Sequence, residues 1–118
     1  MIIYKNFFFD AAHYMPNFPK DHKYRKIHGH SYELKIHIHG DLTAENEWVM
    51  DLENINKHVD PLLKLIDHNL LNDIKGLENP TSENIAKWFW KELKKKIPSI
   101  SKVEINRPRI GGCIYQGI

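Results

Sequence analysis

The sequence has few of the features expected of a secreted or membrane protein. Cys113 is its one cysteine, so no disulfide can form within the chain. No apolar run approaches the roughly 18 residues that a membrane-spanning helix needs, and the N-terminus does not resemble a secretory signal. We therefore expect a soluble, cytoplasmic protein with no membrane partner and with its thiol reduced.

An excess of one charge is also missing, because the net charge is only +2 with neutral histidines. The densest basic run, Lys94–Lys96, lies close to Glu92, a pattern typical of a solvated helix face. We therefore expect no nucleic-acid partner. Internal repeats, low-complexity tracts and linkers are absent, which predicts one domain over residues 1–118. A domain of this size has room for a deep cleft only if subunits share it.

The hydrophobic pattern predicts an α+β fold. Alternating or β-branched runs indicate strands over 1–13, 31–40, 101–106 and 111–116, and "WVMD" (48–51) resembles the end of a further strand. Helical spacing indicates helices over 52–65 and from residue 82 onward, with Asp51 and Thr81 as N-caps. Pro61 is expected to kink or divide the first helix. Grouped helices between pairs of strands favour an antiparallel sheet.

Five of the eight histidines lie within residues 22–40. His28 and His30 are two residues apart in an extended run, so their side chains share one face of the strand, the apolar one. His13 has the same parity as the apolar residues of the first strand. If the two strands pair, three imidazoles converge on the buried side of the sheet, where polar groups need partners.

Three neutral nitrogens with an open fourth position are the layout of a catalytic zinc site, where the metal acts as a Lewis acid. The alternative is that these are core histidines bonded to the backbone. His37 and His39 have the same spacing but lie on the polar face, so we expect exposed histidines there. We interpret His22 and His58 in the same way.

A second cluster, "LIDHNLLND", contains Asp67 and His68 at the end of a helical pattern. A carboxylate beside an imidazole can orient the ring and raise its pKa, which suits proton transfer near neutral pH. A purely structural role at a helix end is the alternative.

Several segments together resemble the 6-pyruvoyltetrahydropterin synthase family, above all its bacterial branch, the 6-carboxy-5,6,7,8-tetrahydropterin synthases of queuosine and deazapurine synthesis. They are "FFFDAAHYMP", "HGHSYELKI", "VMDLENI", "LIDHNLLND", "LENPTSENIAKWFW" and "GCIYQG". The resemblance implies the tunnelling fold (T-fold): a four-stranded antiparallel sheet with two helices on one face. It also implies a homohexamer, a dimer of trimers, with active sites between subunits.

For the chemistry, the resemblance implies Zn²⁺ held by His13, His28 and His30. The implied substrate is a small heterocycle, 7,8-dihydroneopterin triphosphate, and the implied activity is that of a zinc-dependent lyase. Protons would be moved by Asp67 and His68 together with a cysteine. Ser82 and Glu83 match positions of the family's substrate pocket.

The sequence departs from the family pattern at two positions. Tyr24 stands where the family has its catalytic cysteine, and phenols lose their proton near pH 10 rather than near 8.5. Tyr24 is thus the candidate replacement acid or base. Cys113 lies elsewhere and is expected to be a small buried apolar residue.

Arg107 stands where the family has a glutamate that binds the pterin's donor groups. A guanidinium has donors only, so it favours a carboxylate, a phosphate or a carbonyl and ring-nitrogen pair. Alternatively, Arg107 pairs with Glu83 and only rearranges the pocket.

Three functions are consistent with these residues. The first is the zinc-dependent pterin lyase, and the second is a diverged enzyme with an anionic or acceptor-rich substrate. The third is a zinc- or ligand-binding hexamer without turnover. Retention of Asp67 and His68 argues against the third function, whereas Tyr24 and Arg107 argue against the first.

Overall fold

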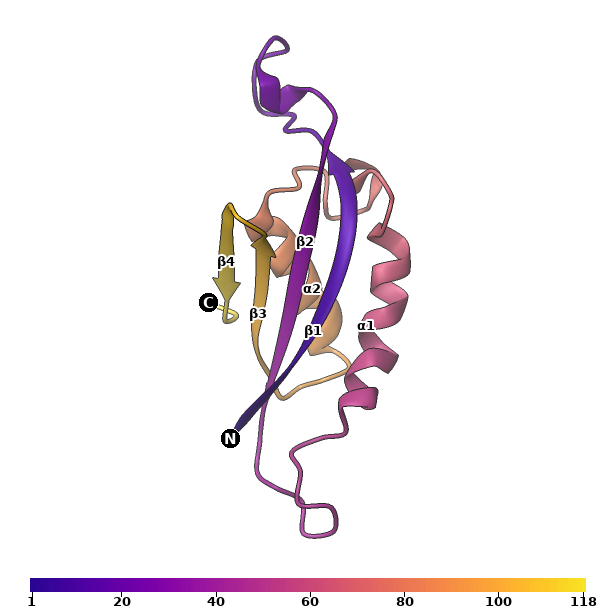
Figure 1. The fold of residues 1–118 in the computed structure, drawn as a ribbon, viewed down its shortest axis with the longest axis vertical. Helices are drawn as coiled ribbons and strands as arrows, with labels where there is room; N and C mark the ends of the chain where they lie inside the picture. Colours follow the sequence, from indigo (N-terminus) through magenta and orange to yellow (C-terminus); the bar gives the residue numbers. More distant parts are fainter.

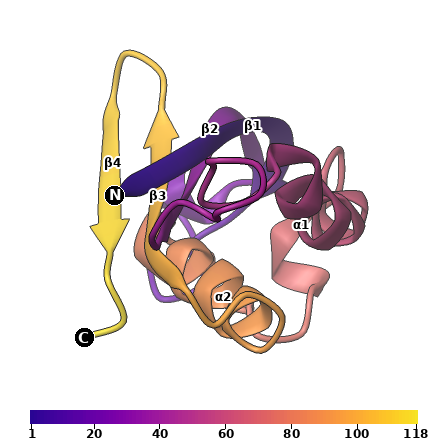
Figure 2. The same cartoon turned by 90° about the horizontal axis from the view of Figure 1, so that it is seen from below.

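The computed structural model describes all 118 residues. One antiparallel sheet contains all four strands in the order β1-β2-β3-β4. The strands are β1 (Ile2–His13), β2 (His28–His39), β3 (Ile100–Arg107) and β4 (Gly111–Tyr115), and the helices are α1 (Leu52–Ile66) and α2 (Ser82–Lys94). Both helices lie between β2 and β3 in sequence and cover one face of the sheet (Figures 1 and 2). The predicted α+β architecture is confirmed.

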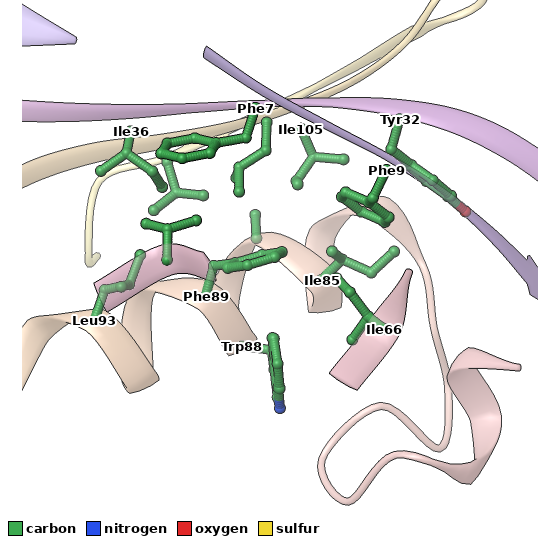
Figure 3. Close-up of a cluster of buried hydrophobic side chains, with 14 of the residues drawn as sticks. Phe7, Phe9, Tyr32, Ile36, Ile66, Ile85, Trp88, Phe89, Leu93 and Ile105 are labelled. Atoms are coloured by element: carbon green, nitrogen blue, oxygen red, sulfur yellow. The ribbon is translucent and has the colours of Figure 1, made fainter. Parts of the chain in front are cut away.

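The β1–β2 ladder contributes seven of the 21 residues of the buried core. It pairs Phe7 with Leu34 and Phe9 with Tyr32, and all four side chains are at most 5% exposed. The rings of Phe9 and Tyr32 stack 4.8 Å apart, and Phe89 of α2 packs beneath them (Figure 3). Because side chains alternate along each strand, the same register decides which residues at the end of the ladder face the helices.

Both helices begin at the predicted N-caps. The Asp51 carboxylate accepts a hydrogen bond from the Glu53 N–H at 3.0 Å, and Thr81 Oγ1 accepts one from the Asn84 N–H at 3.0 Å. Pro61 was expected to kink or divide the first helix, and the division is wrong, since α1 is continuous. Pro61 is on the exposed side of α1, where water can satisfy the carbonyl that loses its partner.

The strand expected over 48–51 is also absent. These residues form bends that lead into α1, and the Thr43 N–H donates to the Trp48 carbonyl at 2.8 Å across a tight turn. Val49 and Met50 pack individually against the core, which explains the apolar run without any strand pairing.

The chain is elongated, with extents of 58 × 25 × 23 Å. Segment 14–27 projects from one end and segment 40–51 from the other (Figure 1). No helix combines the length and apolar character that crossing a membrane requires.

The second face of the sheet is bare of helices and carries large apolar side chains. Their exposed fractions are 51% for Ile2, 52% for Tyr4, 68% for Phe8 and 58% for Ile114. We call this surface, defined by these four residues, the outer face. Apolar side chains concentrated on an uncovered sheet are typical of a surface that another protein covers.

Candidate functional site

Three histidines meet where β1 ends and β2 begins. His13 is the register partner of His28, and Ala11 is the partner of His30. The ring centroids lie 4.5 Å apart for His13 and His28, and 5.0 Å apart for each of these rings and His30. One ring nitrogen from each histidine lies within 4.8 Å of the other two. The convergence that strand pairing predicts is therefore present.

Backbone carbonyls fix two of the three imidazoles. His13 Nδ1 lies 2.9 Å from the Pro80 carbonyl, and His28 Nδ1 lies 2.7 Å from that of Lys26. A carbonyl only accepts, so each Nδ1 carries the proton and each Nε2 keeps a free lone pair. His13 Nε2 is buried without a partner. An orphaned acceptor of this kind, with a second ligand oriented in the same way, suits a transition-metal ion such as zinc.

The protonation states also suit a metal. The pKa of His13 is lowered from 6.5 to about 4, mainly because the ring is buried. The hydrogen bond to Pro80 raises this pKa, whereas the neighbouring His28, His30 and Arg107 lower it further. The pKa of His30 is lowered by burial first and then by Arg107 and His28. Both rings are therefore neutral at pH 7, which is the form that binds metal.

The histidines open into a cleft of about 670 Å³. The same cleft is lined by four other residues singled out from the sequence: Tyr24, Ser82, Glu83 and Arg107. Tyr24 lies in a short turn of the projecting segment 14–27, Ser82 and Glu83 begin α2, and Arg107 ends β3. Three elements far apart in sequence thus contribute to one cleft.

Sequence reasoning missed the apolar side of this cleft and the groups that fix the histidines. Met15, Phe18 and Ile110 line the cleft. The Lys26 and Pro80 carbonyls fix the imidazoles. Backbone acceptors leave no residue-type signal, whereas the aromatic and apolar residues of segment 14–27 could have indicated a ligand-facing loop.

Arg107 contacts the third imidazole. Its Nη1 lies 3.3 Å from His30 Nε2, and its Nε is buried without a partner. Since a guanidinium only donates, His30 Nε2 accepts this bond. The ion pairs of the structure do not include one between Arg107 and Glu83, although both residues line the cleft.

Asp67 and His68 lie outside this cleft. Asp67 Oδ1 accepts a hydrogen bond from the Asp10 N–H at 3.0 Å and lies 3.0 Å from His68 Nδ1. The bond from the Asp10 backbone is the main reason that the pKa of Asp67 is lowered. His68 opens onto a second hollow, which shares His30 with the cleft and is also lined by Asp10, Gly29 and Ser31. One chain therefore does not bring this pair beside Tyr24.

Two further expectations from the sequence concern His37 and Cys113. His37 was expected to be exposed, but its side chain is only 12% exposed and pairs with Glu104. The expectation is wrong because β3 places a carboxylate beside the imidazole on the polar face. Cys113 is partly buried and packs against the core, and burial is the main cause of its raised pKa.

Comparisons with known proteins place the whole chain in one family. The family model described as 6-pyruvoyl tetrahydropterin synthase matches residues 2–117. The 6-carboxy-5,6,7,8-tetrahydropterin synthase of Synechocystis is 41% identical over 110 residues, covering 88% of this chain and 84% of the relative. The dihydroneopterin monophosphate aldolase of Pyrococcus furiosus is 36% identical over 96 residues, covering 81% and 77%.

A solved structure of the 6-pyruvoyl tetrahydropterin synthase of Caenorhabditis elegans shares the fold over the full length. It aligns with a TM-score of 0.90 and 25% identity, covering 100% of this chain and 96% of the nematode chain. The four-stranded sheet with two helices is thus the T-fold expected from the motifs. Together with the match over residues 2–117, this shows that the chain belongs to the 6-pyruvoyl tetrahydropterin synthase family.

Proposed function

We propose that the protein is a zinc-dependent lyase that acts on 7,8-dihydroneopterin triphosphate or a related dihydropterin in pterin or queuosine synthesis. The observation that carries the proposal is the convergence of three imidazole nitrogens within 4.8 Å at one end of a cleft. Membership of a family whose relatives are named as pterin synthases supports this type of enzyme.

The residues present suit zinc. His13, His28 and His30 would hold Zn²⁺, which when bound supplies Lewis-acid polarisation of a substrate oxygen. The Pro80 and Lys26 carbonyls keep His13 and His28 in the tautomer that leaves Nε2 free.

Tyr24 is the proton donor or acceptor that this chain supplies to the cleft. Its side chain is 44% exposed and lines the cleft beside the histidines. Ser82 and Glu83 border the cleft at the start of α2, where free backbone N–H groups favour acceptor groups of a ligand.

The active site is completed between subunits in this proposal. Asp67 and His68 do not line the cleft of their own chain, and in this proposal a neighbouring copy supplies them to it. A homohexamer built as a dimer of trimers would do so, and would also cover the outer face. The sheet offers two edge strands, β1 and β4, through which copies can join.

The test is incubation of zinc-loaded protein with 7,8-dihydroneopterin triphosphate, followed by detection of released triphosphate and acetaldehyde. Both products are expected, and His28→Ala should form neither. 7,8-dihydroneopterin monophosphate should be tested in parallel, because the Pyrococcus relative is named as an aldolase of that compound. A zinc-loaded protein that converts neither compound would contradict this assignment.

The contact of Arg107 favours a second candidate: a diverged enzyme whose substrate presents acceptors or negative charge. The buried Nε of Arg107 has no partner and needs an acceptor. If this candidate is right, the combined change Tyr24→Cys with Arg107→Glu should raise turnover of dihydroneopterin triphosphate. A screen of acidic heterocycles with the wild-type protein should find its substrate. A zinc-loaded protein that converts none of these compounds would instead be a binding hexamer.

A further inference from the structure

We propose that Arg107 competes with the metal for His30 and so couples metal binding to ligand binding. This inference rests on the proposed metal site and goes beyond it. The guanidinium would hold the metal-facing nitrogen of His30 while the site is free of metal. It would turn to acceptor groups of the ligand when the metal takes that nitrogen.

His30 Nε2 is the atom that Arg107 and a metal would share. Arg107 Nη1 lies 3.3 Å from this atom. A neutral imidazole has only one nitrogen that accepts, and that nitrogen has a single lone pair. The lone pair cannot receive a guanidinium N–H and bind a cation at once, so the two uses exclude each other.

The positive charge of Arg107 also opposes a cation at this site. A guanidinium stays protonated at all ordinary pH values. Arg107 Nη1 lies 3.3 Å from His30 Nε2, so the positive charge is close to the nitrogens that would hold a metal. A divalent cation held by these nitrogens would be repelled, so the charge and the hydrogen bond both weaken metal binding.

Arg107 lacks an acceptor for one of its donors. Its Nε is buried without an acceptor even while Nη1 is bonded to His30. Release from His30 would leave a second donor unpaired, and Glu83 makes no ion pair with Arg107 in this structure. A carboxylate, phosphate or carbonyl group in the cleft would satisfy both donors. Metal and acceptor-bearing ligand would therefore favour each other, as reciprocal coupling requires.

The experiment compares zinc affinities of metal-free wild type, Arg107→Met and Arg109→Met, measured by competition with a chromophoric chelator at neutral pH. Methionine keeps an unbranched apolar stem but has neither donor nor charge. Arg109 is the matched control because it is exposed and two residues away on the same hairpin. Arg107→Met should bind zinc at least about tenfold more tightly, as expected for loss of a competing charge-assisted bond. Arg109→Met should match the wild type.

A second measurement uses the wild-type protein and does not depend on the zinc affinity of a variant. The chain has three arginines, Arg25, Arg107 and Arg109, so the side-chain signals of ¹⁵N-arginine-labelled protein are few. Zinc should shift the Arg107 signal in the wild type and leave that of Arg25 unchanged, because Arg25 donates to the Phe18 carbonyl instead. This arm decides the question if Arg107→Met does not fold.

The outcomes separate the inference from the proposed function. Equal or weaker zinc binding by folded Arg107→Met, with zinc bound by both proteins, would overturn the competition and leave the metal site standing. A zinc-bound wild type with an unmoved Arg107 signal would do the same. Absence of zinc binding by every protein would overturn the metal site and the competition with it.

Discussion

At the scale of single residues, Tyr24 presents a phenol to the cleft that holds the three imidazoles. Removing only the hydroxyl in Tyr24→Phe should lower product formation about a hundredfold or more, because general acid–base groups contribute on this scale. Zinc stoichiometry should stay unchanged, since no ligand is altered. Tyr115→Phe is the control, because Tyr115 packs against Trp90 and does not line the cleft. Wild-type turnover by Tyr24→Phe would show that another group moves the proton.

Cys113 has properties that suit packing rather than proton transfer. Burial raises its pKa, so less thiolate is present at a given pH than in the unfolded chain. Iodoacetamide should therefore modify the folded protein much more slowly than the urea-unfolded protein at mildly alkaline pH, and Cys113→Ala should keep turnover. Rapid alkylation of the folded protein, or loss of turnover in Cys113→Ala with zinc still bound, would contradict this account.

The residues differ in how far the sequence predicts them. His13, His28 and His30 follow from strand parity, because a period of two fixes which side chains share a face. The contact between Arg107 and His30 spans 77 residues. It depends on the register of β2 against β3, which no local pattern contains. The same limit explains His37, whose partner Glu104 comes from β3.

At the scale of elements, the start of α2 supports the metal centre. Thr81 caps this helix, and the preceding residue, Pro80, supplies the carbonyl that fixes His13. Thr81→Ala should destabilise the protein by about 1 kcal/mol in urea unfolding. It should also weaken zinc binding, since fraying at the cap loosens the acceptor of His13.

Asp51→Ala is the matched control for this prediction. It removes the equivalent cap of α1, which lies outside the histidine cleft. We expect a similar loss of stability with unchanged zinc affinity, and Thr81→Ser should restore both properties. Equal zinc affinity in Thr81→Ala and Asp51→Ala would show that the cap of α2 does not position His13.

Most elements follow from the sequence because their periodicity and caps agree. The Asp51 and Thr81 caps and the alternation in β2 are examples. The two wrong predictions, a helix divided at Pro61 and a strand over 48–51, share a cause. Both were made from local sequence patterns, which do not contain tertiary contacts. Pro61 is tolerated because it faces water, and Val49 and Met50 contact the core without pairing as a strand.

At the scale of the whole molecule, the histidine cleft is complete within one chain, but the proposed active site is not. Phe8→Asp places a charge on the outer face, where Phe8 is 68% exposed. It should shift the protein from six chains to smaller species in analytical ultracentrifugation and abolish turnover. Zinc should remain bound, because all three ligands come from the same chain.

Leu65→Asp is the control for this change. Leu65 is 52% exposed on α1, which covers the opposite face of the sheet. We expect the assembly and turnover of this variant to match the wild type. Full turnover by a monomeric Phe8→Asp variant would contradict an active site shared between subunits.

The position of Asp67 and His68 shows what one sequence cannot predict. The motif marks the pair, and its bond to the Asp10 backbone places it beside β1. Whether the pair reaches a histidine cleft depends on how copies of the chain pack together, which is a property of the assembly.

The most direct test of the central claim is the zinc content and affinity of purified protein with paired histidine variants. The account predicts one zinc ion per chain, lost in His28→Ala and in His30→Ala. His37→Ala and His39→Ala, which alter the same spacing on the other face of β2, should keep the metal. A wild-type protein that binds no zinc, or a His28→Ala variant that binds it as tightly as the wild type, would contradict the account.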